Sequence, residues 1–385
     1  MSPSSRTAIP WGAAGMVALL VVVEVSIDRH WIELTDPVSL SWRSSAETAE
    51  SQVRDCQLLC LGDSLVKHGV VPSVVERTSG KKTVNLSAAR GSTLLSYRLL
   101  RRALDSGSHP EALILNAKPA VLLGGPEFNA RQWQEIVRPN DALELLQITR
   151  NTPFVLSTVV GRLLPSLRGR LEIQSALIAA IHGKTDPLCS MNPVLLRNWS
   201  VNRGANIAPA TTAYRGAVSS VAERQLYTDI FFVDPANAEA IERILKLAAS
   251  RRIRVFWVLC PVSPSLQFLR DQSGADDLHD RFLRSIVARY PGAVTVLDAR
   301  RAGYSVRFFA DATHLNRLGA LALSQTVALA IGGRGVSQNS PSSNPGWVGL
   351  DPPPETTGLA AQTLEDIEQP RRIIQPDLPT RVSSR

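Results

Sequence analysis

The stretch "LLCLGDSLVKHGV", Leu58 to Val70, decides the fold. Its first residues form a short apolar run, which is typical of a strand buried on both faces. The run ends at Gly62-Asp63-Ser64, and the apolar spacing that follows is that of a helix. A serine between the end of a parallel strand and the start of a helix is well placed to be a nucleophile. The simpler alternative is that Gly-Asp forms a turn and Ser64 merely caps the helix.

The sequence around this stretch predicts an α/β domain. Strand-like runs alternate with helical patterns from residue 57 to about 120, and the alternation resumes from about 236 to 333. This order predicts a parallel sheet with helices on both faces. We therefore expect one α/β/α domain over residues 56–334.

Two segments depart from the alternation. Between about 121 and 227 the sequence is helical in patches that are broken by prolines, which predicts a helical insertion rather than a single loop. Residues 335–385 are rich in Pro, Ser, Thr and charge, so we expect a disordered tail.

The N-terminus predicts a membrane helix over residues 1–30. No charged residue occurs from Ala8 to Val23, Arg6 precedes the run, and no small-residue cleavage pattern follows it. The expectation is an uncleaved signal anchor that leaves the rest of the chain exported, periplasmic or extracytoplasmic, with residues 31–55 as a juxtamembrane connector. A buried amphipathic helix is the alternative, because Glu24 is unfavourable in lipid.

The composition excludes several classes of partner. The chain has 385 residues, a net charge of +8 and 44% hydrophobic residues, enough for a packed core. Its basic clusters are short and lie beside apolar runs, so no nucleic-acid partner is predicted. The four cysteines have no C-x-x-C spacing and the histidines are scattered, so we expect neither a metal nor a cofactor. Protein partners leave no recognisable pattern.

A base for Ser64 is predicted in "FFADATHLNRLG". Asp311 and His314 lie three residues apart just before the last helical pattern, so both side chains lie on the same side of a turn. His314 would take the proton of Ser64, and Asp311 would orient its imidazole. The remaining histidines, such as His68, are expected at the surface or on helices without a role.

These two motifs resemble the first and last blocks of the SGNH/GDSL hydrolase superfamily. The resemblance implies a flavodoxin-like α/β/α fold in which Ser64 is the nucleophile and Asp311 and His314 complete a triad. "NLSAARGST" resembles the second block, which puts forward the Gly91 amide, with that of Ser64, as an oxyanion donor. In "LILNAKP", Asn116 stands where the third block places another donor.

The third block lacks the glycine and the aspartate of the family pattern. With the anchor and the insertion, this departure makes the chain look like the polysaccharide O-acetyltransferase branch, typified by alginate acetylation proteins. The implied function is a serine-dependent acyl-ester hydrolase or O-acyl transferase acting on an envelope carbohydrate or a small ester. The alternative is a non-catalytic envelope scaffold or glycan-binding protein that keeps this fold.

Overall fold

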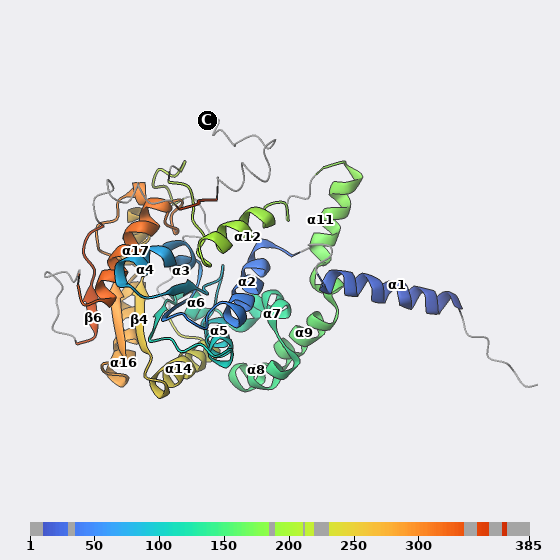
Figure 1. Cartoon of the computed structure of the whole chain (residues 1–385), viewed down its shortest axis with the longest axis horizontal. Helices are drawn as coiled ribbons and strands as arrows, with labels where there is room; N and C mark the ends of the chain where they lie inside the picture. Colours follow the sequence, from blue (N-terminus) through green and yellow to red (C-terminus); the bar gives the residue numbers. More distant parts are fainter. Residues whose placement is uncertain are drawn as a thin grey trace, which may run out of the picture.

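The fold is built on a six-stranded parallel sheet (Figure 1). The computed structural model describes residues 11–29, 35–184, 189–210, 212–218, 231–334, 345–353 and 364–367. The strand order is β2-β1-β3-β4-β5-β6, and every neighbouring pair is parallel. The strands are β1 (Leu58–Leu61), β2 (Thr83–Asn85), β3 (Ala112–Leu115), β4 (Arg254–Leu259), β5 (Val294–Asp298) and β6 (Trp347–Gly349).

Helices cover both faces of the sheet. On one face lie α2 (Pro37–Ser51), α5 (Thr93–Asp105), α14 (Pro235–Ser250) and α16 (Ala275–Arg289). On the other lie α3 (Ser64–Gly69), α4 (Pro72–Ser79) and α17 (Arg317–Ile331). The other α-helices in the described part of the chain are α1 (Trp11–Asp28), α6 (Pro119–Leu123), α7 (Ala130–Ile136), α8 (Ala142–Thr149), α9 (Thr152–Leu163), α10 (Pro165–Arg168), α11 (Arg170–Ile181), α12 (Asn192–Val201) and α15 (Pro264–Ser273).

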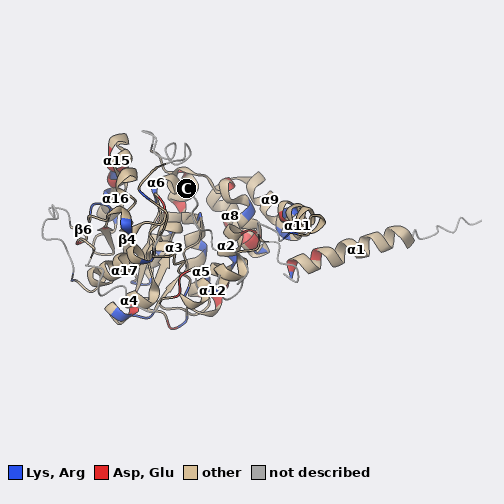
Figure 2. Cartoon of the chain, turned by 90° about the horizontal axis from the view of Figure 1, so that it is seen from above, with Lys and Arg blue, Asp and Glu red and all other residues tan. Residues whose placement is uncertain are grey.

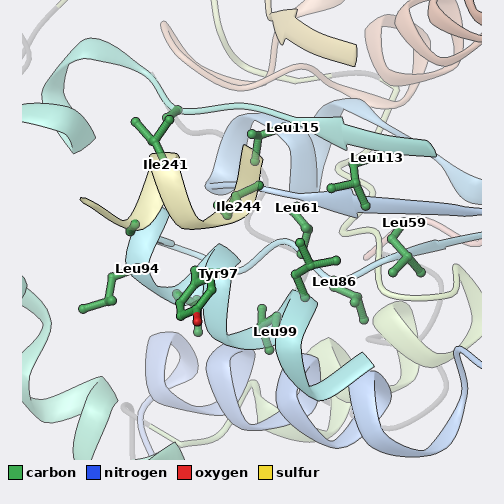
Figure 3. Close-up of a cluster of buried hydrophobic side chains, with 14 of the residues drawn as sticks. Leu59, Leu61, Leu86, Leu94, Tyr97, Leu99, Leu113, Leu115, Ile241 and Ile244 are labelled. Carbon is green, nitrogen blue, oxygen red and sulfur yellow. The ribbon is translucent and has the colours of Figure 1, made fainter. Parts of the chain in front are cut away.

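The sheet divides the core in two because successive strand residues point to opposite faces. Leu59 and Leu61 of β1 pack against the α5 and α14 side, which is drawn in Figure 3. Leu58 and Cys60 pack on the other side against α4 and α17. All four side chains are fully buried, which explains why the strand reads as a continuous apolar run instead of an alternating one. The predicted three-layer α/β class is confirmed.

The interval between β3 and β4 is helical, as predicted. The predicted insertion, about 121–227, contains α6 to α12 in its described part, whereas residues 185–188, 211 and 219–230 lie outside the described residues, and α14 then leads into β4.

The expected connector is partly a core helix. Asp36 caps α2 by accepting hydrogen bonds from the amides of Val38 and Ser39, and Pro37 occupies the first turn. Trp42 is fully buried and donates its indole N–H to the Ala89 carbonyl at 2.9 Å. The polar appearance of this segment is misleading because its buried positions are mostly serine and alanine.

The expected tail contributes the sixth strand. Trp347–Gly349 pairs with β5, and the Leu350 amide donates to the Asp298 carbonyl at 2.9 Å. The rest of the predicted tail (335–344, 354–363 and 368–385) lies outside the described residues.

Helix α1 projects away from the domain (Figure 1). It has 18 residues, is long and apolar enough to cross a membrane, and buries only Ile27. The alternative of a helix buried in the domain is therefore wrong, whereas a signal anchor and a signal sequence both fit.

Candidate active site

Ser64 lies at the point where the strand order reverses. Strand β1 is flanked by β2 and by β3, and the carboxyl ends of β1 and β3 border the crevice where ligands bind in folds of this kind. Ser64 is the first residue of α3, and the cap of this helix is Asp63, whose carboxylate accepts from the Leu65 amide at 2.8 Å. Because Asp63 does the capping, the Ser64 hydroxyl is available for other contacts.

Two glycines allow the three loops around Ser64 to approach closely. Gly62 has a φ of +145°, and a Cβ there would lie 2.8 Å from the Asn116 carbonyl oxygen. A Cβ on Gly91 would lie 2.4 Å from the Gly62 carbonyl oxygen. A side chain at either position would push apart the loops that follow β1, β2 and β3.

His314 connects Ser64 to Asp311. Its Nε2 lies 2.9 Å from the Ser64 Oγ, and its Nδ1 lies 2.9 Å and 3.1 Å from the two carboxylate oxygens of Asp311. With the proton on Nδ1, the ring donates to Asp311 and Nε2 accepts from the serine hydroxyl; this tautomer is assigned from the geometry. The three residues predicted from the two terminal motifs are thus brought together in hydrogen-bonding order.

The loop that carries His314 is fixed locally. Asp311 also accepts hydrogen bonds from the amides of Thr313 and His314, at 2.7 and 2.8 Å. The Ala310 amide donates to the His314 carbonyl, and Asn316 then caps α17. Partial burial disfavours the charged carboxylate, but the hydrogen bonds from His314 and the two amides outweigh this and lower the pKa of Asp311 to about 2.

His68 was expected at the surface but is half-buried, with its ring against that of His314. The two ring centroids are 4.7 Å apart, and the Nε2 of His68 is 3.1 Å from the Asn206 side-chain nitrogen. Burial, together with the nearby His314 and Lys67, lowers the pKa of His68 well below its ordinary value, so His68 is neutral. The sequence contains a signal for this contact, because His68 follows Ser64 by four residues on one helix and shares its face.

Lys67 is a buried cationic side chain on α3. Its amine donates to the carbonyls of Ser87 and Gly204, at 3.2 and 3.1 Å, and lies 4.3 Å from the centroid of the Trp199 ring. Burial lowers the pKa of Lys67 to about 7. These bonds attach α3 both to the loop after β2 and to the chain that follows α12.

The two other predicted oxyanion donors have partners elsewhere. The Gly91 amide donates to the Ala88 carbonyl at 3.0 Å, and one N–H of Asn116 donates to the Val258 carbonyl at 2.7 Å. The Ser64 amide occupies the first position of α3, where a helix amide has no acceptor within the helix. The roles of Gly91 and Asn116 as donors stay predictions.

A pocket of about 460 Å³ opens beside Ser64. Apolar side chains of α6 and of the segment after it, including Val121, Leu123 and Phe128, form one part of its wall. Arg90 and Lys118 add two cations, and Arg90 has the left-handed backbone conformation, with a φ of 54°. The pocket therefore combines an apolar wall with positive charge next to the serine.

Among the described residues, no group of three or more His, Cys, Asp or Glu side chains is arranged to hold a metal ion.

Comparison of the chain with protein-family models and with curated proteins finds no match in either case.

Proposed function

We propose that this chain is a serine-dependent acyl-ester hydrolase or O-acyl transferase that forms an acyl-enzyme at Ser64. The observation that supports this most directly is the Ser64–His314–Asp311 arrangement, with 2.9 Å on each side of the imidazole. Such a geometry activates a hydroxyl that is otherwise a weak nucleophile. The resemblance of the two terminal motifs to SGNH hydrolases points to the same chemistry.

In the proposed first half-reaction, the Ser64 Oγ attacks the acyl carbon of an ester while the His314 Nε2 takes the hydroxyl proton. The ionised Asp311 stabilises the imidazolium, and the Ser64 amide faces the oxyanion. The bond to the leaving alcohol then breaks, and His314 returns the proton to that alcohol. In the second half-reaction, water gives hydrolysis and a sugar hydroxyl gives transfer.

The pocket beside Ser64 suggests the kind of substrate. Its apolar wall suits a short acyl chain, and Arg90 with Lys118 would favour a substrate that carries negative charge near the ester. We place the substrate among the carbohydrates or small esters of the cell envelope. This rests on the proposal that α1 is an uncleaved signal anchor and that the domain is exported.

The second candidate is a non-catalytic scaffold or glycan-binding protein. It is favoured by one observation, the commitment of the Gly91 amide and of an Asn116 N–H to backbone carbonyls. Loss of one oxyanion donor typically reduces turnover by about 100- to 1000-fold and does not abolish it. The bonded triad therefore favours the enzyme over the scaffold.

The test uses the full-length chain in a nonionic detergent, because a truncation at the predicted connector would cut α2 and one at residue 334 would remove β6. Release of nitrophenol from p-nitrophenyl acetate and the intact mass of the protein would be followed for wild type, Ser64→Ala and His314→Ala. The matched control is Ser285→Ala, at an exposed serine of α16. We expect a burst and an acylated mass in wild type and in the control only.

Wild-type release no faster than that of Ser64→Ala would contradict the enzyme and favour the scaffold. If the acyl-enzyme forms, addition of sugars as acceptors separates transfer from hydrolysis by the appearance of an acylated sugar.

A further inference from the structure

The helices α9, α10 and α11 carry an exposed apolar surface. Leu163 is 68% exposed and Ile181 is 80% exposed, and most of the large apolar side chains exposed in the described residues lie either here or on α1. The α9–α11 face, as we name it, comprises Leu163, Leu167, Leu171, Leu177, Ile178 and Ile181. Soluble proteins rarely expose so many large apolar side chains together.

Two of the four charged residues of these helices, Arg168 and Glu172, turn inward, whereas Arg170 is exposed and Arg162 is half-buried. Arg168 is 8% exposed and pairs with Glu135 at 2.9 Å, while Glu172 is 1% exposed and pairs with Arg131. This is the reverse of a soluble amphipathic helix, which directs its charges to water and its apolar side to the core. In α11 the apolar residues are spread around nearly the whole helix, although only Glu172 and Ala179 are buried.

The α9–α11 face is attached to the base of α1. The carboxylate of Glu24 accepts hydrogen bonds from the amide of Ser166, at 2.9 Å, and from its hydroxyl. Asp28 accepts from Arg162 at 2.6 Å. In both overall views, α9 and α11 lie around the end of α1 that joins the domain, and α11 runs across the direction of α1 (Figures 1 and 2).

These contacts define the depth of the face if α1 enters a bilayer. An 18-residue helix is roughly 27 Å long, close to the hydrocarbon thickness of about 30 Å. Glu24 lies one turn from the end of α1, and Ser166, its partner, is next to Leu167 in the chain. Leu163 and Leu167 therefore lie near the level at which α1 leaves the hydrocarbon.

We propose that the α9–α11 face lies in the membrane–water interface, as a monotopic surface beside the transmembrane helix. Its occupant is lipid: the acyl-chain boundary would cover the leucines and isoleucines, and the inward charges keep their protein partners. Glu24, which argued against a membrane span, is then an interfacial carboxylate bonded to α10. The proposal goes beyond the acyl-transfer function and does not depend on it.

Lipid is favoured over a second copy of the chain or a partner protein, because the attachment to α1 alone brings the face to the bilayer. The exposed apolar residues elsewhere, such as Phe268 on α15, are scattered and have no such attachment.

The test places an environment-sensitive fluorophore at single cysteines in the full chain, in a Cys189→Ser background, since the other three cysteines are buried. Labels at Leu167→Cys and Ile181→Cys report on the face, and one at Met16→Cys reports on α1. The matched control is Phe268→Cys, an apolar residue of α15 that is 60% exposed; Figure 2 shows α15 at the end of the molecule away from α1. The proteins are reconstituted into phosphatidylcholine–phosphatidylglycerol vesicles with spin-labelled lipids as depth-dependent quenchers.

We expect blue-shifted emission at 167 and 181 that is quenched by spin labels near the headgroups and protected from aqueous iodide. The label at 268 should be quenched by iodide, and that at 16 by deep spin labels. If iodide quenches the labels at positions 167 and 181 as strongly as the label at 268, while the label at 16 is still protected, the proposal is overturned. The membrane anchor would then be unaffected by this result. Emission at 167 that reverts to the aqueous value when protein is diluted in lipid overturns it in favour of a second copy.

Discussion

Lys67 provides the prediction whose size follows most directly from the structure. The residue is 2% exposed, its amine is held by two backbone carbonyls, and burial lowers its pKa to about 7 from 10.5 in an unfolded chain. Between these two pKa values the folded protein binds fewer protons than the unfolded one. The contribution of Lys67 to the free energy of unfolding must therefore increase with pH across this window.

With a folded pKa of about 7, the contribution of Lys67 should grow by about 1.5 kcal/mol between about pH 7 and about pH 8.5. The assay is urea unfolding of wild type and of Lys67→Met in the same detergent at several pH values. Methionine keeps the apolar stem and removes the titrating group. The titration of the cysteines is common to both proteins, so it cancels when the free energy of unfolding of Lys67→Met is subtracted from that of wild type. If the difference in free energy of unfolding between the two proteins stays constant over this pH range, the lowered pKa of Lys67 is refuted, and with it the described packing of α3.

Three further predictions concern the site and the core. Asp311→Asn should slow acyl-enzyme formation by roughly 10³- to 10⁴-fold, measured by stopped-flow nitrophenol release, because the amide no longer fixes the imidazole tautomer; an unchanged burst would remove Asp311 from the triad. Gly91→Ala should lower the free energy of unfolding, measured in urea, by about 2 kcal/mol or more, because its Cβ would lie 2.4 Å from the Gly62 carbonyl oxygen. The control Gly332→Ala, whose Cβ would lie 3.4 Å from the nearest atom, should leave the free energy of unfolding nearly unchanged. Trp42→Ala should lower the free energy of unfolding by about 3–5 kcal/mol, because this side chain of α2 is fully buried. A loss of no more than about 0.5 kcal/mol would show that the segment is only a connector.

The candidate triad could be predicted because its signals are local. A strand end followed by a serine, and an aspartate three residues before a histidine, are patterns that need no knowledge of distant contacts. The pairing of Ser64 with His314 then follows from the parallel sheet, which collects the loops after its strands at one edge. The structure adds that Asp63 is the helix cap, a point on which the sequence left two readings open.

Other parts could not be predicted because their burial depends on partners far along the chain. The pattern of α2 is polar, yet its small serines and alanines pack where larger residues would not fit. Strand β6 has only three residues and is defined by its pairing with β5, which no local composition reveals. The position of His68 was readable from its spacing to Ser64, but its contact with Asn206, a residue of the insertion, was not.

The insertion is therefore part of what positions the serine. Helix α3 has six residues, too few to be stable alone, and the Asn85 side chain donates to the carbonyls of Val66 and of Val70, the residue that caps its C-terminus. The chain after α12 completes this support: the Arg203 carbonyl accepts from the Asn85 amide at 3.0 Å, and the Asn206 amide donates to the Lys67 carbonyl at 2.8 Å. These bonds fix the position of α3. A change in the insertion that displaced residues 203–206 would therefore move Ser64 relative to His314 without altering either side chain.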